Sequence, residues 1–86
     1  MGKKVKKIDN ILLVKDVATG LELSFDERWK FNGDYEKPTF SPSMFCDFGN
    51  GIITHCYVRD GNIEYLSDST HELSGKIVNC EDYSEE

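Results

Sequence analysis

Apolar residues occur in short segments, and turn-forming residues separate these segments along the whole chain. Residues 21–25 alternate apolar and polar side chains, which is the period-two pattern of a half-buried strand. Residues 8–17 and 52–58 are rich in β-branched side chains, and residues 63–66 and 76–78 are shorter segments of the same kind. No segment keeps a helical period over three turns, so the pattern predicts strands joined by tight turns.

Turn chemistry supports this prediction at several places. Asn32-Gly33 predicts a type I′ hairpin turn, because both central residues of that turn need a positive φ. Asp60-Gly61 predicts a second hairpin between the strands that flank it. Pro38 and Pro42 flank a segment that is therefore expected as an edge strand or an ordered loop rather than a central strand. A capped helical turn is expected at residues 68–73.

The predicted fold class is mainly β: a small single-domain antiparallel β-sheet or roll of about six short strands, with at most one short helical turn. The chain has 86 residues, which is room for one domain. Residues 8–80 are predicted to form this domain. Residues 1–7 are expected to be a basic flexible N-terminus, and residues 81–86 an acidic flexible tail.

Charge and composition exclude several classes of protein. The chain carries 10 basic and 16 acidic side chains, a net charge of −6, which disfavours direct binding to nucleic acid. No apolar run is long enough to span a membrane. Most of the acidity lies in residues 8–80, which suggests a surface that mimics nucleic acid or meets a basic protein. Lysines gather in residues 3–7 and suggest an anionic partner.

The cysteines and the N-terminus indicate where the protein acts. Cys46, Cys56 and Cys80 are odd in number and have no CxxC spacing, so free, partly buried thiols are expected. No apolar segment of the length of a secretory signal follows the N-terminal lysines. The predicted location is the cytoplasm.

The densest group of polar and aromatic side chains lies in residues 29–43. One interpretation is a decorated hairpin with Trp29 and Phe31 in the core. The other is the rim of a ligand site, where aromatic faces stack on a planar group while Thr39, Ser41, Ser43 and backbone amides bind polar or anionic atoms. Aromatic packing around Trp29, Phe31, Phe40 and Phe45 is expected to stabilise the core.

A second group consists of His55, Arg59, Asp60, Asp68, Thr70 and His71. Hairpin pairing is expected to bring the two histidine regions to one end or face of a sheet. Arg59 can clamp a carboxylate or phosphate, and Asp68 can orient a histidine. The alternative is ordinary turn, cap and hydrogen-bonding chemistry. GxSxG, Walker and GxGxxG motifs are absent, and no pair of residues has the spacing of a zinc site.

Residues 29–78 resemble a small phage and prophage family of unknown function that often carries the label "ammonia monooxygenase". The matching motifs are WKFNGD at 29–34, PTFSPS at 38–43, His55, VRDG at 58–61 and DSTH at 68–71. The resemblance implies a phage or prophage origin. Members often carry cysteines where this chain has Thr54 and Ser69, and an N-terminal CxxC that is absent here, so any zinc of the family is expected to be lost.

The resulting functional prediction is a phage-derived accessory protein that acts by binding, against a host defence system, without cofactor or metal. It would either sequester a small anionic, nucleotide-like ligand or block a host defence protein through its acidic surface. The predicted ligand-binding residues are Trp29, Asn32, Asp34, Thr39, Ser41, His55, Arg59 and His71. A hydrolase-like enzyme using His55, His71 and Asp68 is the alternative, and a structural virion component is another. A homodimer is possible, because pairing would cover exposed strand edges.

Overall fold

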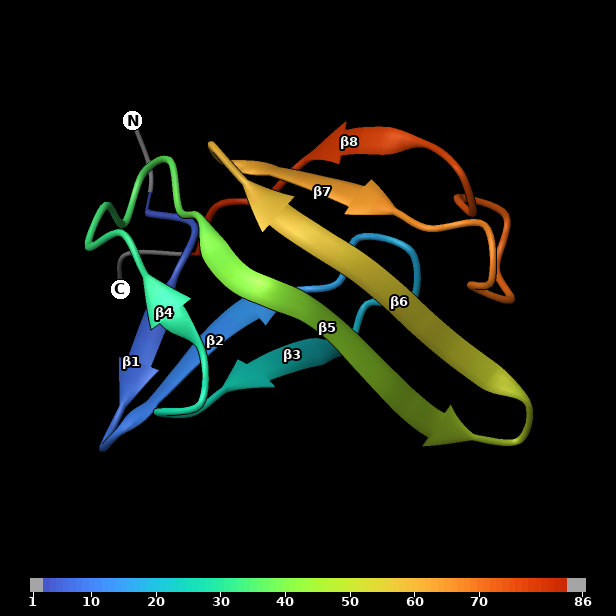
Figure 1. Cartoon of the computed structure of the whole chain (residues 1–86), viewed down its shortest axis with the longest axis horizontal. Helices are drawn as coiled ribbons and strands as arrows, with labels where there is room; N and C mark the ends of the chain where they lie inside the picture. The colour runs from blue at the N-terminus through green and yellow to red at the C-terminus, as the bar shows by residue number, and fades with distance from the viewer. Residues whose placement is uncertain (1–2, 84–86) are drawn as a thin grey trace.

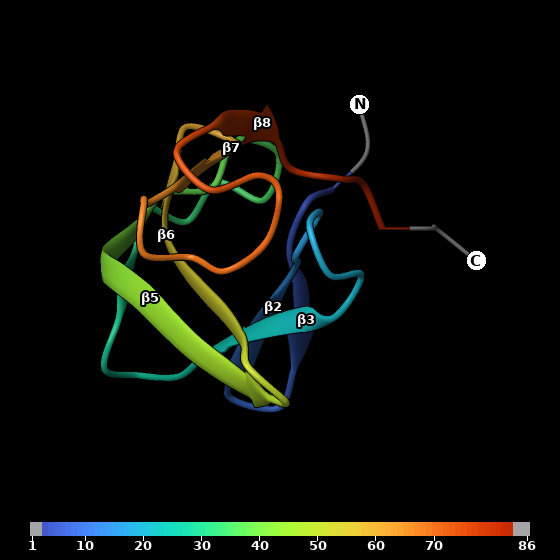
Figure 2. The same ribbon diagram turned by 90° about the vertical axis from the view of Figure 1, so that its right-hand side faces the viewer.

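Eight antiparallel strands form two sheets in the computed structural model, which describes residues 3–83 (Figures 1 and 2). Strands that follow one another along the chain are also neighbours within each sheet, and the described residues contain no helix. The first sheet consists of β1 (Lys6–Ile8), β2 (Ile11–Lys15) and β3 (Glu22–Phe25). The second consists of β4 (Lys30–Phe31), β5 (Phe40–Gly49), β6 (Ile52–Arg59), β7 (Asn62–Tyr65) and β8 (Ile77–Asn79).

The core lies between the sheets, where each contributes the apolar positions of its alternating strands. Leu23 and Phe25 of β3 are buried from one side, and Val58 and Ile63 from the other. The Phe25 and Phe40 rings stack with their centroids 4.0 Å apart, which joins the two sheets. An antiparallel β fold with an aromatic core is thus confirmed.

Phe45 is the exception to the predicted aromatic core. Its side chain is 56% exposed and faces outward from β5, so the prediction that it packs inside is wrong. Met44, the residue before it, is 4% exposed and takes the inward position. The alternation of a strand allows only one of two adjacent side chains to enter the core.

Three local predictions need correction. The expected helical turn at 68–73 is a series of turns, in which the Ser74 N–H donates to the His71 carbonyl over 3.2 Å. The strand expected at 8–17 is interrupted, because Asp9 takes a positive φ of 55° and reverses the chain between β1 and β2. The segment before Pro42 is not at an edge, since Phe40 pairs with both β4 and β6.

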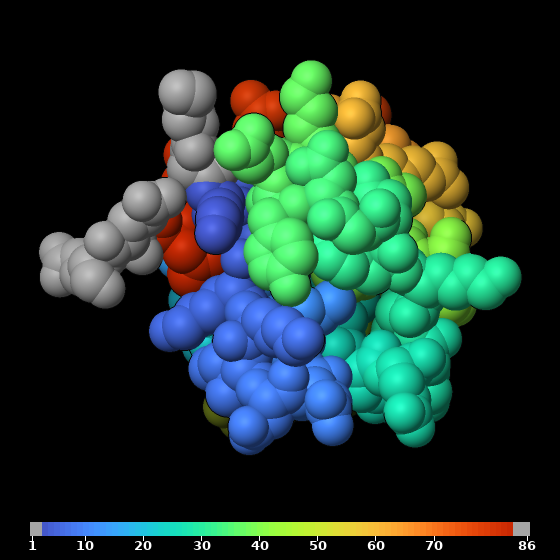
Figure 3. All heavy atoms as spheres, turned by 90° about the vertical axis from the view of Figure 1, so that its left-hand side faces the viewer, coloured from blue at the N-terminus to red at the C-terminus, as the bar shows by residue number. Residues whose placement is uncertain are grey.

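Asn32-Gly33 does not form the predicted two-residue hairpin turn. Gly33 has a φ of +85°, but Asn32 is not in the left-handed region, and the chain makes a wide loop before β5 begins. The Asn32 side chain closes this loop by accepting N–H bonds from Asp34 (3.1 Å) and Thr39 (3.2 Å). Figure 3 shows the loop beside the first described residues, where the Lys4 N–H donates to the Tyr35 carbonyl over 2.8 Å.

The described structure includes residues that the sequence predicts to be a flexible N-terminus. Val5 is 2% exposed, and β1 begins at Lys6, within the stretch expected to be flexible. Near the other end, the Tyr83 N–H donates to the Lys3 carbonyl over 2.8 Å. The flexibility predicted for residues 1–2 and 84–86 lies outside the described residues. Within residues 3–83, no helix could cross a membrane.

Candidate functional site

The imidazole of His55 lies between a serine hydroxyl and a carboxylate. Its Nε2 is 3.3 Å from Ser43 Oγ, and its Nδ1 is 2.9 Å from Asp68 Oδ2 and 3.0 Å from Oδ1. The His55 side chain is 24% exposed and that of Asp68 60%, so the group lies open to solvent on the molecular surface. A serine, a histidine and an aspartate in this order form a hydrogen-bonded chain that can move a proton from the hydroxyl to the imidazole.

The hairpin of β5 and β6 places Ser43 beside His55. Phe45 is the cross-strand partner of His55, and Ser43 lies two residues earlier on the same face of β5. The register depends on an irregularity near the turn: Gly49 pairs with Ile52, but Asp47 pairs with Ile53, so β5 has one more residue than β6. This β-bulge puts Ser43 and His55 on the same face of the sheet.

The segment after β7 carries Asp68 and is fastened to β6 by side-chain hydroxyls. Ser69 Oγ accepts the His55 N–H over 2.9 Å and donates to the His55 carbonyl over 3.0 Å. Thr70 binds Ile53 in the same way: its N–H donates to the Ile53 carbonyl over 3.0 Å, and its Oγ1 accepts the Ile53 N–H over 2.8 Å. These bonds fix the backbone directly after the carboxylate that meets His55.

Ser69 and Thr54 occupy positions where the resembling family was expected to carry cysteines. Ser69 is 7% exposed and Thr54 is fully buried, and both form hydrogen bonds, so polar contacts hold this region of the chain. Within residues 3–83, no three His, Cys, Asp or Glu side chains gather in an arrangement that could hold a metal ion.

The aromatic side chains around the site have distinct roles. The Phe45 ring contacts the His55 ring edge-on, with centroids 5.4 Å apart. Trp29 Nε1 donates to the Ser43 carbonyl over 3.3 Å and ties the serine to the segment before β4. Arg59 lies over the Tyr57 ring at 4.1 Å and pairs with Glu64 at 3.2 Å, so its guanidinium already has partners on the sheet.

Several of the predicted ligand-binding residues hold loops together. Asp34 Oδ1 accepts the N–H groups of Glu36 and Lys37, and these bonds lower the pKa of its carboxyl. Thr39 Oγ1 accepts the Asp60 N–H over 2.8 Å. Ser41 is exposed on β5 opposite Lys30. Trp29 and His55 are the members of the predicted set that have direct contacts with Ser43.

His71 lies on the other side of β6 from His55. Its Nε2 is 3.2 Å from Thr54 Oγ1, and Thr54 points inward while His55 points outward. Thr54 Oγ1 also donates over 2.7 Å to Asp16, which is fully buried and accepts a short hydrogen bond from Tyr65. The structure therefore does not bring the two histidines together; His71 caps a buried network.

Burial also governs the cysteines, which are free thiols as expected. It raises the pKa of Cys56 to about 12 and that of Cys80 to about 11, so both thiols stay protonated at neutral pH. A buried, protonated thiol is a poor nucleophile. Ser43 is therefore the better candidate for a nucleophile.

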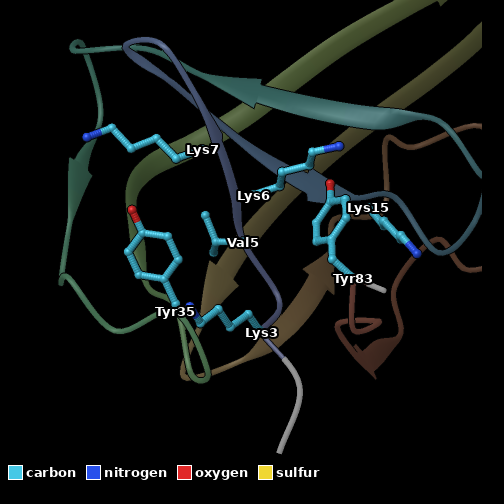
Figure 4. Close-up of a pocket in the computed structure, with 7 residues that line it drawn as sticks. All are labelled: Lys3, Val5, Lys6, Lys7, Lys15, Tyr35 and Tyr83. Carbon is cyan, nitrogen blue, oxygen red and sulfur yellow. The ribbon is translucent and has the colours of Figure 1, made fainter. Parts of the chain in front are cut away.

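A hollow of about 660 Å³ lies away from this site, over β1 and the end of the described chain (Figure 4). It contains none of the predicted ligand-binding residues. Lysines and tyrosines dominate its lining, which consists of Lys3, Val5, Lys6, Lys7, Lys15, Tyr35 and Tyr83. The lysine cluster near the N-terminus is therefore gathered around a concave surface.

Sequence reasoning treated Ser43 only as a polar group of a ligand rim and overlooked it as a nucleophile. A search for GxSxG could not find it, because Ser43 lies in a β-strand and not at a strand-to-helix turn. The available signal was a serine and a histidine on two strands joined by the turn at Asn50-Gly51. That signal points to a shared face only when the bulge is known.

The geometry of Ser43, His55 and Asp68 is that of the hydrolases that use a serine nucleophile. The sequence model of one protein family matches residues 15–66, and the chain belongs to that family, described as the bacterial ubiquitination-like system serine protease (BubE). The match contains Ser43 and His55 and ends shortly before Asp68. No curated protein and no solved structure matches the chain.

Proposed function

We propose that this protein is a serine protease of a bacterial ubiquitination-like system, with Ser43 as nucleophile, His55 as general base and Asp68 as the group that orients His55. The observation that carries the proposal is the position of His55, with one ring nitrogen at Ser43 Oγ and the other at the Asp68 carboxylate. The family description supports the same chemistry. The geometry and the family description together favour an enzyme over the binding protein that the sequence predicts.

The proposed reaction follows from the hydrogen bonds. Ser43 Oγ attacks the carbonyl carbon of a peptide bond while its proton moves to His55 Nε2, and the Asp68 carboxylate stabilises the imidazolium that forms. The tetrahedral intermediate collapses when His55 returns this proton to the leaving amine, which leaves an acyl group on Ser43. A water molecule, deprotonated by His55, then releases the acid and restores the serine.

The oxyanion of the intermediate needs hydrogen-bond donors near Ser43. Residues 41–43 fall in the irregular part of β5, between the pairs Phe40–Val58 and Met44–Cys56, so the Ser43 N–H is outside the regular ladder. Ser43 has no cross-strand partner in the register of β5 with β4 or β6. The Ser43 N–H is the donor that we assign to the oxyanion.

A fluorophosphonate probe tests the proposal, because it reacts covalently with activated serines without requiring a particular peptide sequence. We expect one adduct, on Ser43, and its loss in Ser43→Ala and in His55→Gln. Ser41→Ala is the matched control, since Ser41 lies two residues away and has no contact with His55. An unlabelled wild-type chain, or an adduct that persists in Ser43→Ala, would contradict the proposal.

Binding of an anionic ligand is a second candidate function, favoured by the four lysines around the 660 Å³ hollow in a chain of net charge −6. Phosphate-bearing molecules are attracted to such a cluster. A thermal-shift screen with linear and cyclic nucleotides tests it, and Lys6→Glu with Lys7→Glu should abolish any shift. A shift that survives both substitutions would place the ligand elsewhere.

The action of the protein in the cytoplasm, its origin in a phage or prophage and its assembly into a homodimer remain predictions. Gel filtration with light scattering tests the last of these directly. A host defence protein remains the predicted partner for the acidic surface, and co-purification from infected cells would identify it.

A further inference from the structure

The outer edge of β5 begins at the proposed nucleophile and has little cover. β4 pairs with β5 only at Lys30–Ser41 and Phe31–Phe40, whereas β5 continues to Gly49 (Figure 1). From residue 43 onward, β6 is the strand that pairs with β5 among the described residues. A length of strand with one unpaired edge can accept another strand.

The direction of the free backbone groups follows from the partners of β6. Ile53 and His55 use their N–H and carbonyl groups on the side away from β5, where they bind Thr70, Ser69 and Leu66. Thr54 and Cys56 therefore face β5. In an antiparallel pair, residues that exchange hydrogen bonds alternate with residues that do not, so Cys46 and Met44 bond to β6.

Phe45 and Asp47 consequently direct their N–H and carbonyl groups toward the open edge. The Ser43 carbonyl accepts a bond from Trp29 Nε1, in the segment that leads into β4 on this edge. The indole of Trp29 closes the edge at Ser43 itself. The open part therefore extends from Phe45 toward Gly49, on one side of the nucleophile only.

We infer that the substrate is an extended polypeptide segment that adds as a strand to the edge of β5, pairs with the backbone of Phe45 and Asp47, and presents its scissile carbonyl to Ser43. This inference rests on the proposed protease function. The pairing lies on one side of the scissile bond, because Trp29 occupies the edge beyond it. Main-chain pairing supplies affinity that does not depend on sequence, and side-chain contacts supply the selectivity.

Phe45 is the selectivity-determining side chain in this arrangement. Its ring is 56% exposed, shares the face of Ser43 and contacts His55. An exposed ring beside the reacting atoms forms an apolar platform for the substrate side chain next to the scissile bond. The segment is therefore expected to carry an apolar residue there.

The test uses a mixture of unstructured decapeptides, with cleavage products identified by mass spectrometry. The peptide cleaved fastest is resynthesised with one backbone amide N-methylated at a time, and kcat/KM is measured with the wild-type chain. We expect about a tenfold loss at alternate residues on one side of the scissile bond, because only alternate N–H groups face β5. Uniform tolerance of N-methylation would overturn the inference.

Two variants examine the enzyme side of the same contact. Phe45→Ala and Phe45→Pro both remove the ring, but only the proline removes the N–H that faces the edge. We expect kcat/KM of Phe45→Pro to be about tenfold below that of Phe45→Ala. Ile77→Ala is the control, since Ile77 is 66% exposed on β8, at the far edge of the sheet. Equal values for the two Phe45 variants would overturn the inference.

The outcomes separate this inference from the proposed function. Fluorophosphonate labelling of Ser43 without cleavage of any decapeptide would retain the serine nucleophile and reject the edge-strand substrate. No labelling of Ser43 would reject the proposed function itself. If Phe45→Pro fails to fold, as judged by circular dichroism, the N-methyl series decides alone, because it needs no altered protein.

Discussion

Ser69 holds both backbone polar groups of His55: its hydroxyl accepts the N–H over 2.9 Å and donates to the carbonyl over 3.0 Å. A backbone strand would normally supply such a pair of bonds. Here the Ser69 side chain, directly after Asp68, supplies both bonds, and the Leu66 N–H also donates to the His55 carbonyl over 2.8 Å. The residue that carries the orienting carboxylate and the strand that carries the base are thus joined one residue away from the contact between them.

Ser69→Ala should reduce both stability and activity. The substitution removes the partner of the His55 N–H, while the His55 carbonyl keeps its bond from the Leu66 N–H. Because Ser69 is 7% exposed, we expect a cost of about 1–3 kcal/mol. Urea unfolding measures the loss, and a lowered kcat for peptide cleavage is expected with it. Ser24→Ala is the control, because Ser24 is exposed on β3. Equal stability of the two variants would refute the role assigned to Ser69.

Asp68→Asn should lower kcat much more than it changes KM. An amide of the same size can no longer stabilise the imidazolium, and it can hold His55 in the wrong tautomer. We expect kcat to fall about a hundredfold or more. Asp9→Asn, an exposed carboxylate in the turn between β1 and β2, serves as the comparison. A kcat near that of the wild-type chain would remove Asp68 from the mechanism.

Tyr65→Phe should destabilise the fold through Asp16. Burial and the hydrogen bond to Asp16 raise the pKa of Tyr65, which therefore stays a neutral donor to the buried carboxylate. Removal of this hydroxyl is expected to cost about 1–3 kcal/mol in urea unfolding. Tyr57→Phe tests the specificity of the effect, because Tyr57 lies on the outer face of β6. A similar loss in both variants would contradict the assignment.

The protein should become less stable above pH 9. The pKa of Cys56 is about 12 in the folded chain against an ordinary value of 9.0, so the unfolded chain loses this proton first. The stability associated with the neutral thiol is complete below pH 9 and is lost as the pH rises toward 12. Thermal melts between these values check the trend. A melting temperature that stays level in Cys56→Ala and also in the wild-type chain would contradict it.

Alkylation provides an independent measure of the same burial. At pH 8, iodoacetamide should modify Cys46, which is partly exposed, well before Cys56 and Cys80. Mass spectrometry of peptides after short exposure gives the order, and addition of urea should remove the difference. Early modification of Cys56 would contradict its buried position.

Much of the fold could be predicted from the sequence because it depends on local patterns. Residues 21–25 alternate and form β3, and Asp60-Gly61 forms a hairpin turn with φ values of 51° and 82°. The type I′ turn predicted at Asn32-Gly33 is wrong because the Asn32 side chain forms hydrogen bonds elsewhere. The Asn32 amide bonds across a wide loop, and that tertiary preference overrides the turn propensity of the dipeptide.

The candidate site could not be predicted from the sequence because it depends on the pairing register of β5 and β6. With Gly49 opposite Ile52, one-for-one counting would place Cys46 opposite His55. That register would put Ser43 on the opposite face from the histidine. The bulge shifts the partner of His55 to Phe45 and exchanges the two faces of β5. Gly49, with a φ of 89°, lies beside the extra residue, but a glycine there is equally typical of the turn that follows. The identity of the nucleophile therefore depended on the structure.

Ser43, His55 and Asp68 all lie within residues 43–68, on one hairpin and the segment that follows it. Contacts this close in sequence close short loops, and short loops form early when a chain folds. The proton-transfer chain is therefore expected to assemble without waiting for the N-terminal sheet to dock. The N-terminal sheet would then contribute to the stability of the fold and not to catalysis.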